Sequence, residues 1–137
     1  MRLVLDTCAL MALALGGRMA AAAPGAIAQA GRADTAYLSA ITALEIGQQS
    51  SVGRLRFTDG SSARTWLERA VSKFRLRQVP VTASIALAAY ELPDPFHKDP
   101  ADRIIVATAR LLRAPVVTID RMILAYGRRG HVDVIDY

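Results

Sequence analysis

Short apolar runs alternate with helical segments along this chain, and this alternation leaves few folds open to it. The clearest run is Val116–Ile119, which is continuous and mostly β-branched, as in strands that are buried on both faces of a parallel sheet. Arg2–Leu5 is a run of the same type, and the helical segment Thr7–Leu15 follows it. Strands that lead into helices are typical of α/β domains with a parallel sheet.

The other predicted elements continue this order. Further strands are predicted at Ala36–Leu38, Gln78–Val81 and Val132–Ile135. Helices are predicted over Met19–Ala30 (closed by Gly31), Ala40–Gln49 (capped by Ser39), Ala63–Arg77, Thr82–Tyr90 and Ala101–Arg113, with a short one after Asp120, and Ser50–Ser62 and Leu92–Pro100 are predicted loops. We therefore expect a three-layer α/β/α fold with a largely parallel central sheet, formed by one domain over residues 1–137.

The composition is that of an ordered protein, with 53% hydrophobic and 21% charged residues. No apolar run reaches the roughly 18 residues of a membrane span, because Arg18 and Pro24 interrupt the alanine-rich segment. The N-terminus loosely resembles a secretory signal, but Asp6 interrupts its apolar stretch. The single cysteine, Cys8, is expected to be a small buried residue in a reducing compartment. We expect a soluble, cytoplasmic protein without a membrane partner.

The net charge of +5 comes almost entirely from arginine, which binds phosphate with two parallel hydrogen bonds. A nucleic-acid partner and a merely solvated basic surface are about equally consistent with this charge. The arginines that would follow an RNA backbone, or else form a solvated helix face, are Arg64, Arg69, Arg75 and Arg77.

Acidic side chains occur at places that a parallel sheet would bring together. Asp6 and Asp120 each follow a predicted strand, and ligands of open α/β sheets bind beyond the carboxyl ends of the strands. Asp102 falls in the first turn of a helix that would begin at this edge, and Glu45 lies in a helix between Leu44 and Ile46. A half-buried carboxylate at position 45 is unusual unless it has a function.

Carboxylates that converge repel one another and raise each other's pKa values unless a cation neutralises them. Oxygen ligands without a nearby Cys or His suit Mg²⁺ or Mn²⁺. Such an ion could activate water for phosphodiester cleavage, and Thr7 and Thr118 could contact its bound waters. Neither His97 nor His131 is needed as a general base in this scheme.

Each acid also has a structural explanation. Asp6 and Asp120 could cap the helices that follow them. Asp102 could stabilise a helix dipole within a cap that Asp99 and Pro100 begin, and Glu45 could extend to solvent or pair with an arginine. Independent caps, however, give no reason for all of these acids to meet at one edge of the sheet.

Four stretches resemble the successive motifs of PIN domains, especially those of VapC-type toxins. They are LVLDTCALM, the Glu within ALEIG, HKDPADRIIVATA and VVTIDRM. The resemblance covers nearly the whole chain, and its most specific part is Asp99-Pro-Ala-Asp102-Arg103 before an alanine-rich helix.

The resemblance implies a metal-dependent endoribonuclease in which Asp6, Glu45, Asp102 and Asp120 bind Mg²⁺ or Mn²⁺, with Asp99 as a neighbour. It also implies a homodimer and a cognate antitoxin whose C-terminal segment covers the active site. Cys8 stands where the family more often has Ser or Asn, a residue that could support the acids. Met11, Leu15 and Met19 could line a groove for the antitoxin, although their helical spacing favours a core stripe.

Two other functions remain open on the sequence alone. The first is a phosphatase with Asp6 as its nucleophile, although Cys8 stands where such enzymes of the haloacid dehalogenase type need a second Asp. The second is a non-catalytic RNA-binding or regulatory module. Arg103 and Arg121 follow candidate ligands directly, and salt bridges or solvation are expected for both.

Overall fold

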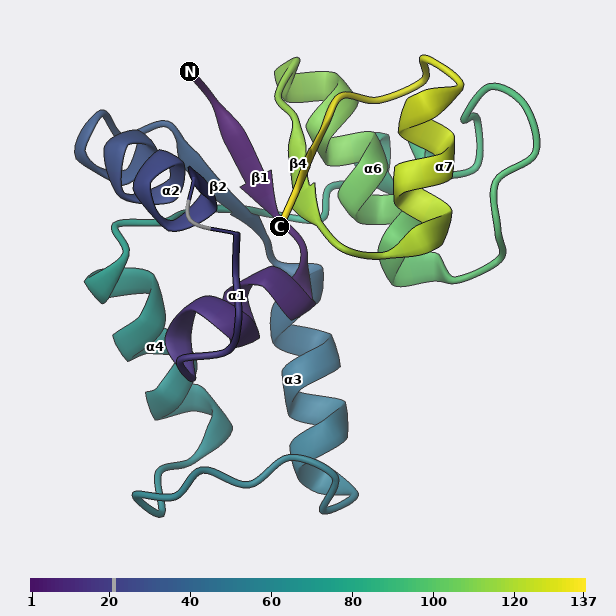
Figure 1. Ribbon diagram of the computed structural model, residues 1–137. Coiled ribbons are helices and arrows are strands. Elements are labelled where there is room, and N and C mark those ends of the chain that lie inside the picture. Colours follow the sequence, from purple (N-terminus) through teal and green to yellow (C-terminus); the bar gives the residue numbers. More distant parts are fainter. Residues whose placement is uncertain (21) are drawn as a thin grey trace.

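A parallel sheet forms the centre of the computed structural model, which describes residues 1–20 and 22–137 (Figure 1). Its strands are β1 (Leu3–Leu5), β2 (Ala36–Ser39), β3 (Arg77–Val79), β4 (Val116–Thr118) and β5 (Val134–Asp136). Within the described residues they pair in the order β3-β2-β1-β4-β5, and every pairing is parallel. The predicted, largely parallel central sheet is therefore confirmed.

Helices connect the strands as the sequence predicts, with shifts of a few residues at their ends. They are α1 (Thr7–Ala14), α2 (Ala22–Arg32), α3 (Ile41–Ser51), α4 (Ala63–Lys73), α5 (Ala83–Ala88), α6 (Pro100–Leu112) and α7 (Arg121–Arg128). The largest difference is at the end of α4, where Phe74 is the C-cap and Arg75 has a φ of 53°. This left-handed residue ends the helix before the predicted Arg77 and directs the chain into β3.

The helix α2 differs from its prediction at both ends. Pro24 and Gly25 lie in its first turn, where a missing N–H costs no hydrogen bond. Gly31 does not close α2 but lies inside it, and a Cβ built there would be 2.6 Å from the backbone oxygen of Phe74. Gly31 therefore allows the end of α4 to approach α2 closely. Ala21, part of the predicted helix Met19–Ala30, lies outside the described residues.

Alternating side chains of the central strands pack into separate cores on the two faces of the sheet. Leu3 and Leu5 of β1 join a cluster with residues of α1, α2 and α4, whereas Val4 joins a cluster with residues of α6 and α7. Figure 1 shows α1, α2 and α4 on one side of the sheet and α6 and α7 on the other. The expected three-layer α/β/α arrangement is therefore confirmed.

The strand order reverses beside β1. The chain passes from β1 to β2 and β3 in one direction and then returns to β4 on the other side of β1, where Leu5 pairs with Val117. Adjacent parallel strands whose connections leave in opposite directions open a crevice at their carboxyl ends. The residues that follow β1 and β4 therefore enter the same crevice.

Some side chains differ from expectation in their exposure. Cys8 is exposed rather than buried, and Leu44, the apolar residue before Glu45 in α3, is 60% exposed. Met11 and Met19 pack against the core, as a core stripe predicts, but Leu15 is 55% exposed. Among the described residues, no helix combines the length and the apolar character that a membrane crossing would need.

The close contact at Gly31 predicts a stability difference between two glycine substitutions in helices. Gly31→Ala should lower the free energy of unfolding by about 1–3 kcal/mol, because the Cβ meets backbone that cannot move easily. Gly47→Ala, in α3, is the matched control, because nothing lies within 4 Å of its Cβ and alanine favours helix by up to about 1 kcal/mol. Urea denaturation measures both values. Equal effects of the two substitutions would contradict the close packing of α2 and α4.

Candidate metal centre

Asp6 lies at the carboxyl end of β1 and is only 4% exposed. One carboxylate oxygen, Oδ1, accepts a hydrogen bond of 2.7 Å from the backbone N–H of Ala9 and so caps α1. The hydroxyl group of Thr118, on the neighbouring strand β4, lies near this carboxylate and lowers its pKa. Asp6 is therefore a helix cap, as the structural explanation proposed, and it is also held against β4.

Asp120 follows β4 after one intervening residue and caps α7. Its Oδ1 accepts from the backbone N–H groups of Met122 and Ile123, at 2.9 and 3.0 Å. Its own N–H donates to the hydroxyl oxygen of Thr118 over 2.9 Å. Thr118 therefore lies between Asp6 and Asp120, and its contact with a metal-bound water stays a prediction.

Asp102 lies in the first turn of α6, and Asp99 is the N-cap of that helix. The Asp99 carboxylate accepts from the Asp102 N–H over 3.1 Å, and Pro100 is the first helical residue. These contacts agree with the predicted cap. The Asp102 carboxylate, however, is turned toward His97: its Oδ2 lies 3.0 Å from the His97 Nε2.

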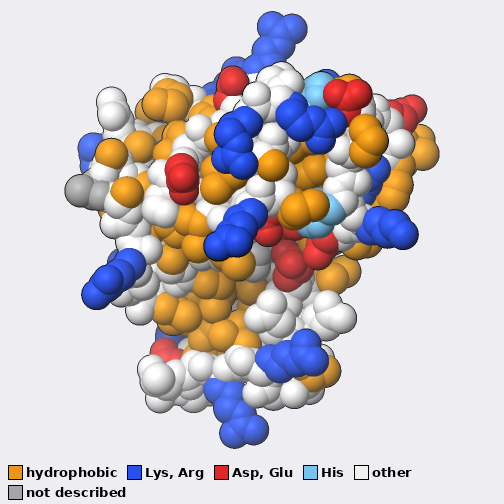
Figure 2. Space-filling model, turned by 45° about the vertical axis from the view of Figure 1, so that its right-hand side comes forward, with side chains coloured by type: hydrophobic (Ala, Val, Ile, Leu, Met, Phe, Trp, Pro, Cys, Tyr) orange, Lys and Arg blue, Asp and Glu red, His pale blue; other side chains and the backbone are white. Residues whose placement is uncertain are grey.

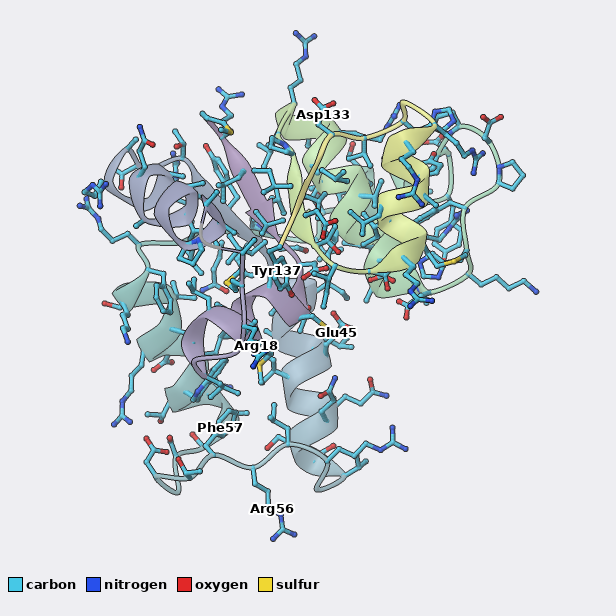
Figure 3. The ribbon with its side chains drawn as sticks, in the orientation of Figure 1. Arg18, Glu45, Arg56, Phe57, Asp133 and Tyr137 are labelled. Carbon is cyan, nitrogen blue, oxygen red and sulfur yellow. The ribbon has the colours of Figure 1, made fainter. Side chains whose placement is uncertain are left out.

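Glu45 reaches the same region from α3, and Figure 3 shows it on the part of that helix near the C-terminal Tyr137. Its Oε1 accepts a hydrogen bond of 2.5 Å from the hydroxyl of Thr7. The Thr7 and Thr42 hydroxyl oxygens are 2.9 Å apart, and Thr42 is the donor of that pair, since the single Thr7 proton goes to Glu45. Glu45 is half-buried, and no arginine pairs with it among the described residues.

The pKa values of these acids show that they are close together and poorly solvated. Burial, the largest cause, raises the pKa of Asp6 to about 6, and repulsion by Asp120 and Glu45 adds to it. Burial also raises the pKa of Asp102 to about 7, with repulsion by Asp99, Asp120, Glu45 and Asp6. The pKa of Glu45 is raised by burial and by Asp99. The acids from four separate elements therefore repel one another across one crevice.

This donor set fits a divalent cation. Each cap uses Oδ1 of Asp6 or Asp120, which leaves Oδ2 of both side chains outside the caps, and a positive ion would relieve the repulsion that raises the pKa values. The most compact group consists of His97, Asp102 and Asp120, whose ligand atoms lie within 4.8 Å of one another. The expectation that no histidine lies near the acids is therefore wrong.

His97 was missed because the sequence reasoning considered it only as a general base. Its signal was its position in the short loop before α6, two residues before the Asp99 cap. A loop that ends in a helix cap stays close to the first turn of that helix, so its side chains can reach Asp102. Figure 2 shows acidic side chains gathered beside a histidine on one face, with Lys and Arg side chains around them.

Cys8 belongs to the surroundings of the centre. Although Cys8 is exposed, neighbouring atoms shield its thiol from part of the solvent; this desolvation raises the pKa of the thiol, and repulsion by Asp6 and Glu45 adds to the effect. The thiol therefore stays protonated at neutral pH, which makes it a poor metal ligand.

The arginines singled out in the sequence fall into three groups. Arg103, for which a salt bridge or solvation was expected, forms no salt bridge among the described residues, and its Nε and Nη1 atoms are buried. Its guanidinium group lies over the rings of Tyr90 and Phe96, at 4.9 and 6.0 Å. Arg121, Arg64 and Arg77 are exposed, Arg69 pairs with Asp59 at 3.2 Å and Arg75 with Asp34 at 3.5 Å. The exposed arginines can therefore be solvated or can contact a polyanion.

Comparisons with known proteins agree with this fold. A family model for the PIN domain matches residues 3–129. The chain is similar in structure to VapBC2 from Rickettsia felis bound to a promoter DNA fragment, with 17% identity, coverage of 100% of this chain and 99% of that chain, and a TM-score of 0.70. No curated protein matches the chain.

Two further solved structures share the fold. A toxin-antitoxin complex from Klebsiella pneumoniae has 23% identity over 96% of this chain and 94% of that chain, with a TM-score of 0.61. FitAB bound to an IR36 DNA fragment has 22% identity over 98% and 94%, with a TM-score of 0.53.

The repulsion among the acids predicts that neutralising Asp102 stabilises the metal-free protein at high pH. The folded-state pKa of Asp102 is raised from 3.8 to about 7, so its favourable contribution is complete below pH 4 and is lost as the pH rises through 7. In EDTA, Asp102→Asn should raise Tm at pH 8 and have a smaller effect at pH 5. Each kcal/mol of repulsion removed corresponds to about 3–5 °C.

The exposed Asp133, which precedes β5 at the opposite end of the sheet, supplies the control. Asp133→Asn should change Tm equally at the two pH values, as calorimetry can measure. An Asp102→Asn protein that is destabilised by the same amount at pH 5 and pH 8 would show that the acids do not repel one another.

Proposed function

The chain belongs to the PIN domain family, and from this membership we propose that it is a metal-dependent endoribonuclease that hydrolyses RNA phosphodiester bonds. PIN domains are in general metal-dependent nucleases. The observation that carries the proposal is the meeting of Asp6, Glu45, Asp102 and Asp120 at the crevice beside β1, with the pKa values of three of them raised. We propose that these four acids bind Mg²⁺ or Mn²⁺.

The proposed mechanism assigns a distinct task to each group of residues. A divalent ion supplies Lewis-acid stabilisation of the charge that develops on the scissile phosphate. The four acids would hold that ion from the carboxyl ends of β1 and β4, from α3 and from the first turn of α6. The backbone N–H of Ala9 fixes the Asp6 carboxylate, and the hydroxyl of Thr7 fixes Glu45. Because these partners hold the carboxylates in place, little rearrangement is needed on binding.

RNA is the substrate we propose, because the acids lie on a surface with basic side chains around them (Figure 2). The net charge of +5 favours a polyanion. The exposed arginines would attract the phosphate backbone of an RNA. The acidic crevice would accept the scissile phosphate only after a bound cation has neutralised the charge of the acids. This requirement makes cleavage dependent on the metal.

We further propose that the protein is the toxin of a toxin–antitoxin pair, which would inhibit translation and growth in the cytoplasm. The solved structures that share its fold are VapBC2, FitAB and a toxin-antitoxin complex. Its partners would then be a cognate antitoxin that covers the acids and a second copy of the chain in a homodimer. The domain would comprise residues 1–137.

The proposal predicts RNA cleavage that needs both the metal and the acids. The purified protein should cleave a pool of structured RNAs with Mg²⁺ or Mn²⁺ but not with EDTA. Asp6→Asn and Asp102→Asn should each reduce the rate by more than about 10-fold, the lower limit for loss of a residue that only supports a metal ligand. The loss in these two variants excludes a contaminating nuclease, whereas Asp133→Asn, prepared in parallel, controls for the substitution itself and should cleave as the wild type does.

Other outcomes of this experiment point to other functions. A folded, antitoxin-free protein that cleaves no RNA with either metal would contradict the nuclease proposal. Hydrolysis of a chromogenic phosphate ester that Asp6→Asn abolishes, with RNA intact, would instead indicate a phosphatase. Binding of RNA that is unchanged by EDTA, without cleavage, would indicate a binding or regulatory module.

A further inference from the structure

We propose that His97 supplies a nitrogen ligand to the ion at the acid cluster, so that the centre is a mixed nitrogen–oxygen site that prefers Mn²⁺ to Mg²⁺. This inference rests on the proposed metal-dependent function and goes further, because it adds a ligand of another chemical type and selects between the two ions. It concerns the imidazole ring as a ligand and not as an acid or a base.

The position of the His97 ring is the first support for the inference. Its Nε2 atom is 3.0 Å from Oδ2 of Asp102, and the side chains of both residues are 20% exposed. The Nε2 atom itself is buried and has no hydrogen-bond partner among the residues that the structure describes, because its approach to Asp102 lacks hydrogen-bond geometry. A buried polar atom without a partner is costly and calls for an explanation. A metal ion between the imidazole and the carboxylates would provide one.

The spacing of the donor atoms is the second support. Ligand atoms of His97, Asp102 and Asp120 lie within 4.8 Å of one another. Bonds of about 2.1 Å from one ion to nitrogen or oxygen place ligand atoms up to about 4.2 Å apart. Small side-chain rotations would therefore bring all three residues onto one ion. Asp6 and Glu45 are not in this compact group, although repulsion links both of them to Asp102.

The third support is that the loop before α6 is held in place by packing. The Phe96 ring meets His97 edge-on, with centroids 4.5 Å apart, and lies 4.5 Å from the Tyr126 ring. Tyr126 is 1% exposed in the core, and its hydroxyl group donates to the backbone oxygen of Pro93. At the other end of the loop Asp99 caps α6. The imidazole is therefore presented to the acids by a fixed segment, as a preorganised ligand requires.

The chemistry of the donors leads to the choice of ion. Mg²⁺ prefers oxygen ligands and retains several water molecules. A site that includes imidazole gains affinity along the transition-metal series, which begins with Mn²⁺. An all-carboxylate centre would bind both ions through oxygen alone, whereas a centre with His97 should favour Mn²⁺.

The direct test is pulsed electron paramagnetic resonance of Mn²⁺ bound to the full chain, which detects nitrogen coordinated to the ion. The wild type should show the ¹⁴N coupling of a bound imidazole, and His97→Gln should lose it. His131→Gln is the matched control, because the other histidine, His131, lies 2.7 Å from Asp94, outside the compact group. It should keep the coupling.

Titration calorimetry with each ion alone tests the preference. His97→Gln should weaken Mn²⁺ binding by about 10-fold or more and Mg²⁺ binding much less, whereas His131→Gln should leave both affinities unchanged. Wild-type protein that binds Mn²⁺ without nitrogen coupling would overturn this inference while leaving the proposed nuclease function intact. Wild-type protein that binds Mg²⁺ but no Mn²⁺ would overturn this inference alone, and wild-type protein that binds neither ion would overturn both proposals. Because the spectrum of the wild type decides the matter, a folding defect in His97→Gln would not prevent the test.

Discussion

The parallel pairing of β1 with β4 is the constraint on which the rest of this structure depends. Because the chain leaves β1 toward β2 and later returns to β4 on its other side, the two carboxyl ends open one crevice. The strands themselves are buried on both faces, so their position is set by apolar packing and hydrogen bonding in the sheet. This packing brings the acids that follow the strands together, although the acids repel one another.

Helix capping and ligand binding are compatible roles for the same carboxylates. Asp6 and Asp120 each cap a helix through Oδ1, and this bond also fixes the direction of the other oxygen. The Asp120 N–H donates to the hydroxyl of Thr118, which also lies near Asp6. A local interaction, the cap, therefore orients the side chain for a role that depends on the whole fold. The structural explanation of each acid is correct and does not compete with the functional one.

The cluster is maintained at a cost in stability. The raised pKa values of Asp6 and Asp102 mean that burial and repulsion disfavour their charged forms at neutral pH. Local conflicts of this kind are expected at functional sites, where the remaining core offsets them. The apolar clusters on the two faces of the sheet supply this offset here. A bound cation would reverse the sign of the effect by favouring the charged forms.

The sequence by itself determined the parallel α/β fold, because buried strands such as Val116–Thr118 can be recognised from their β-branched, apolar composition. It also placed Asp6 and Asp120 at one edge of the sheet, because both follow strands whose carboxyl ends lie at the same edge. The sequence could not predict helix ends that depend on tertiary contacts. The contact between Gly31 and the Phe74 carbonyl, for example, joins residues that are far apart in the sequence. Only the tertiary structure decided that Thr7 binds Glu45, that Cys8 is exposed and that His97 turns toward Asp102. The physical reason is that strand composition and caps are local, whereas the direction and surroundings of a side chain depend on packing between elements far apart in the chain.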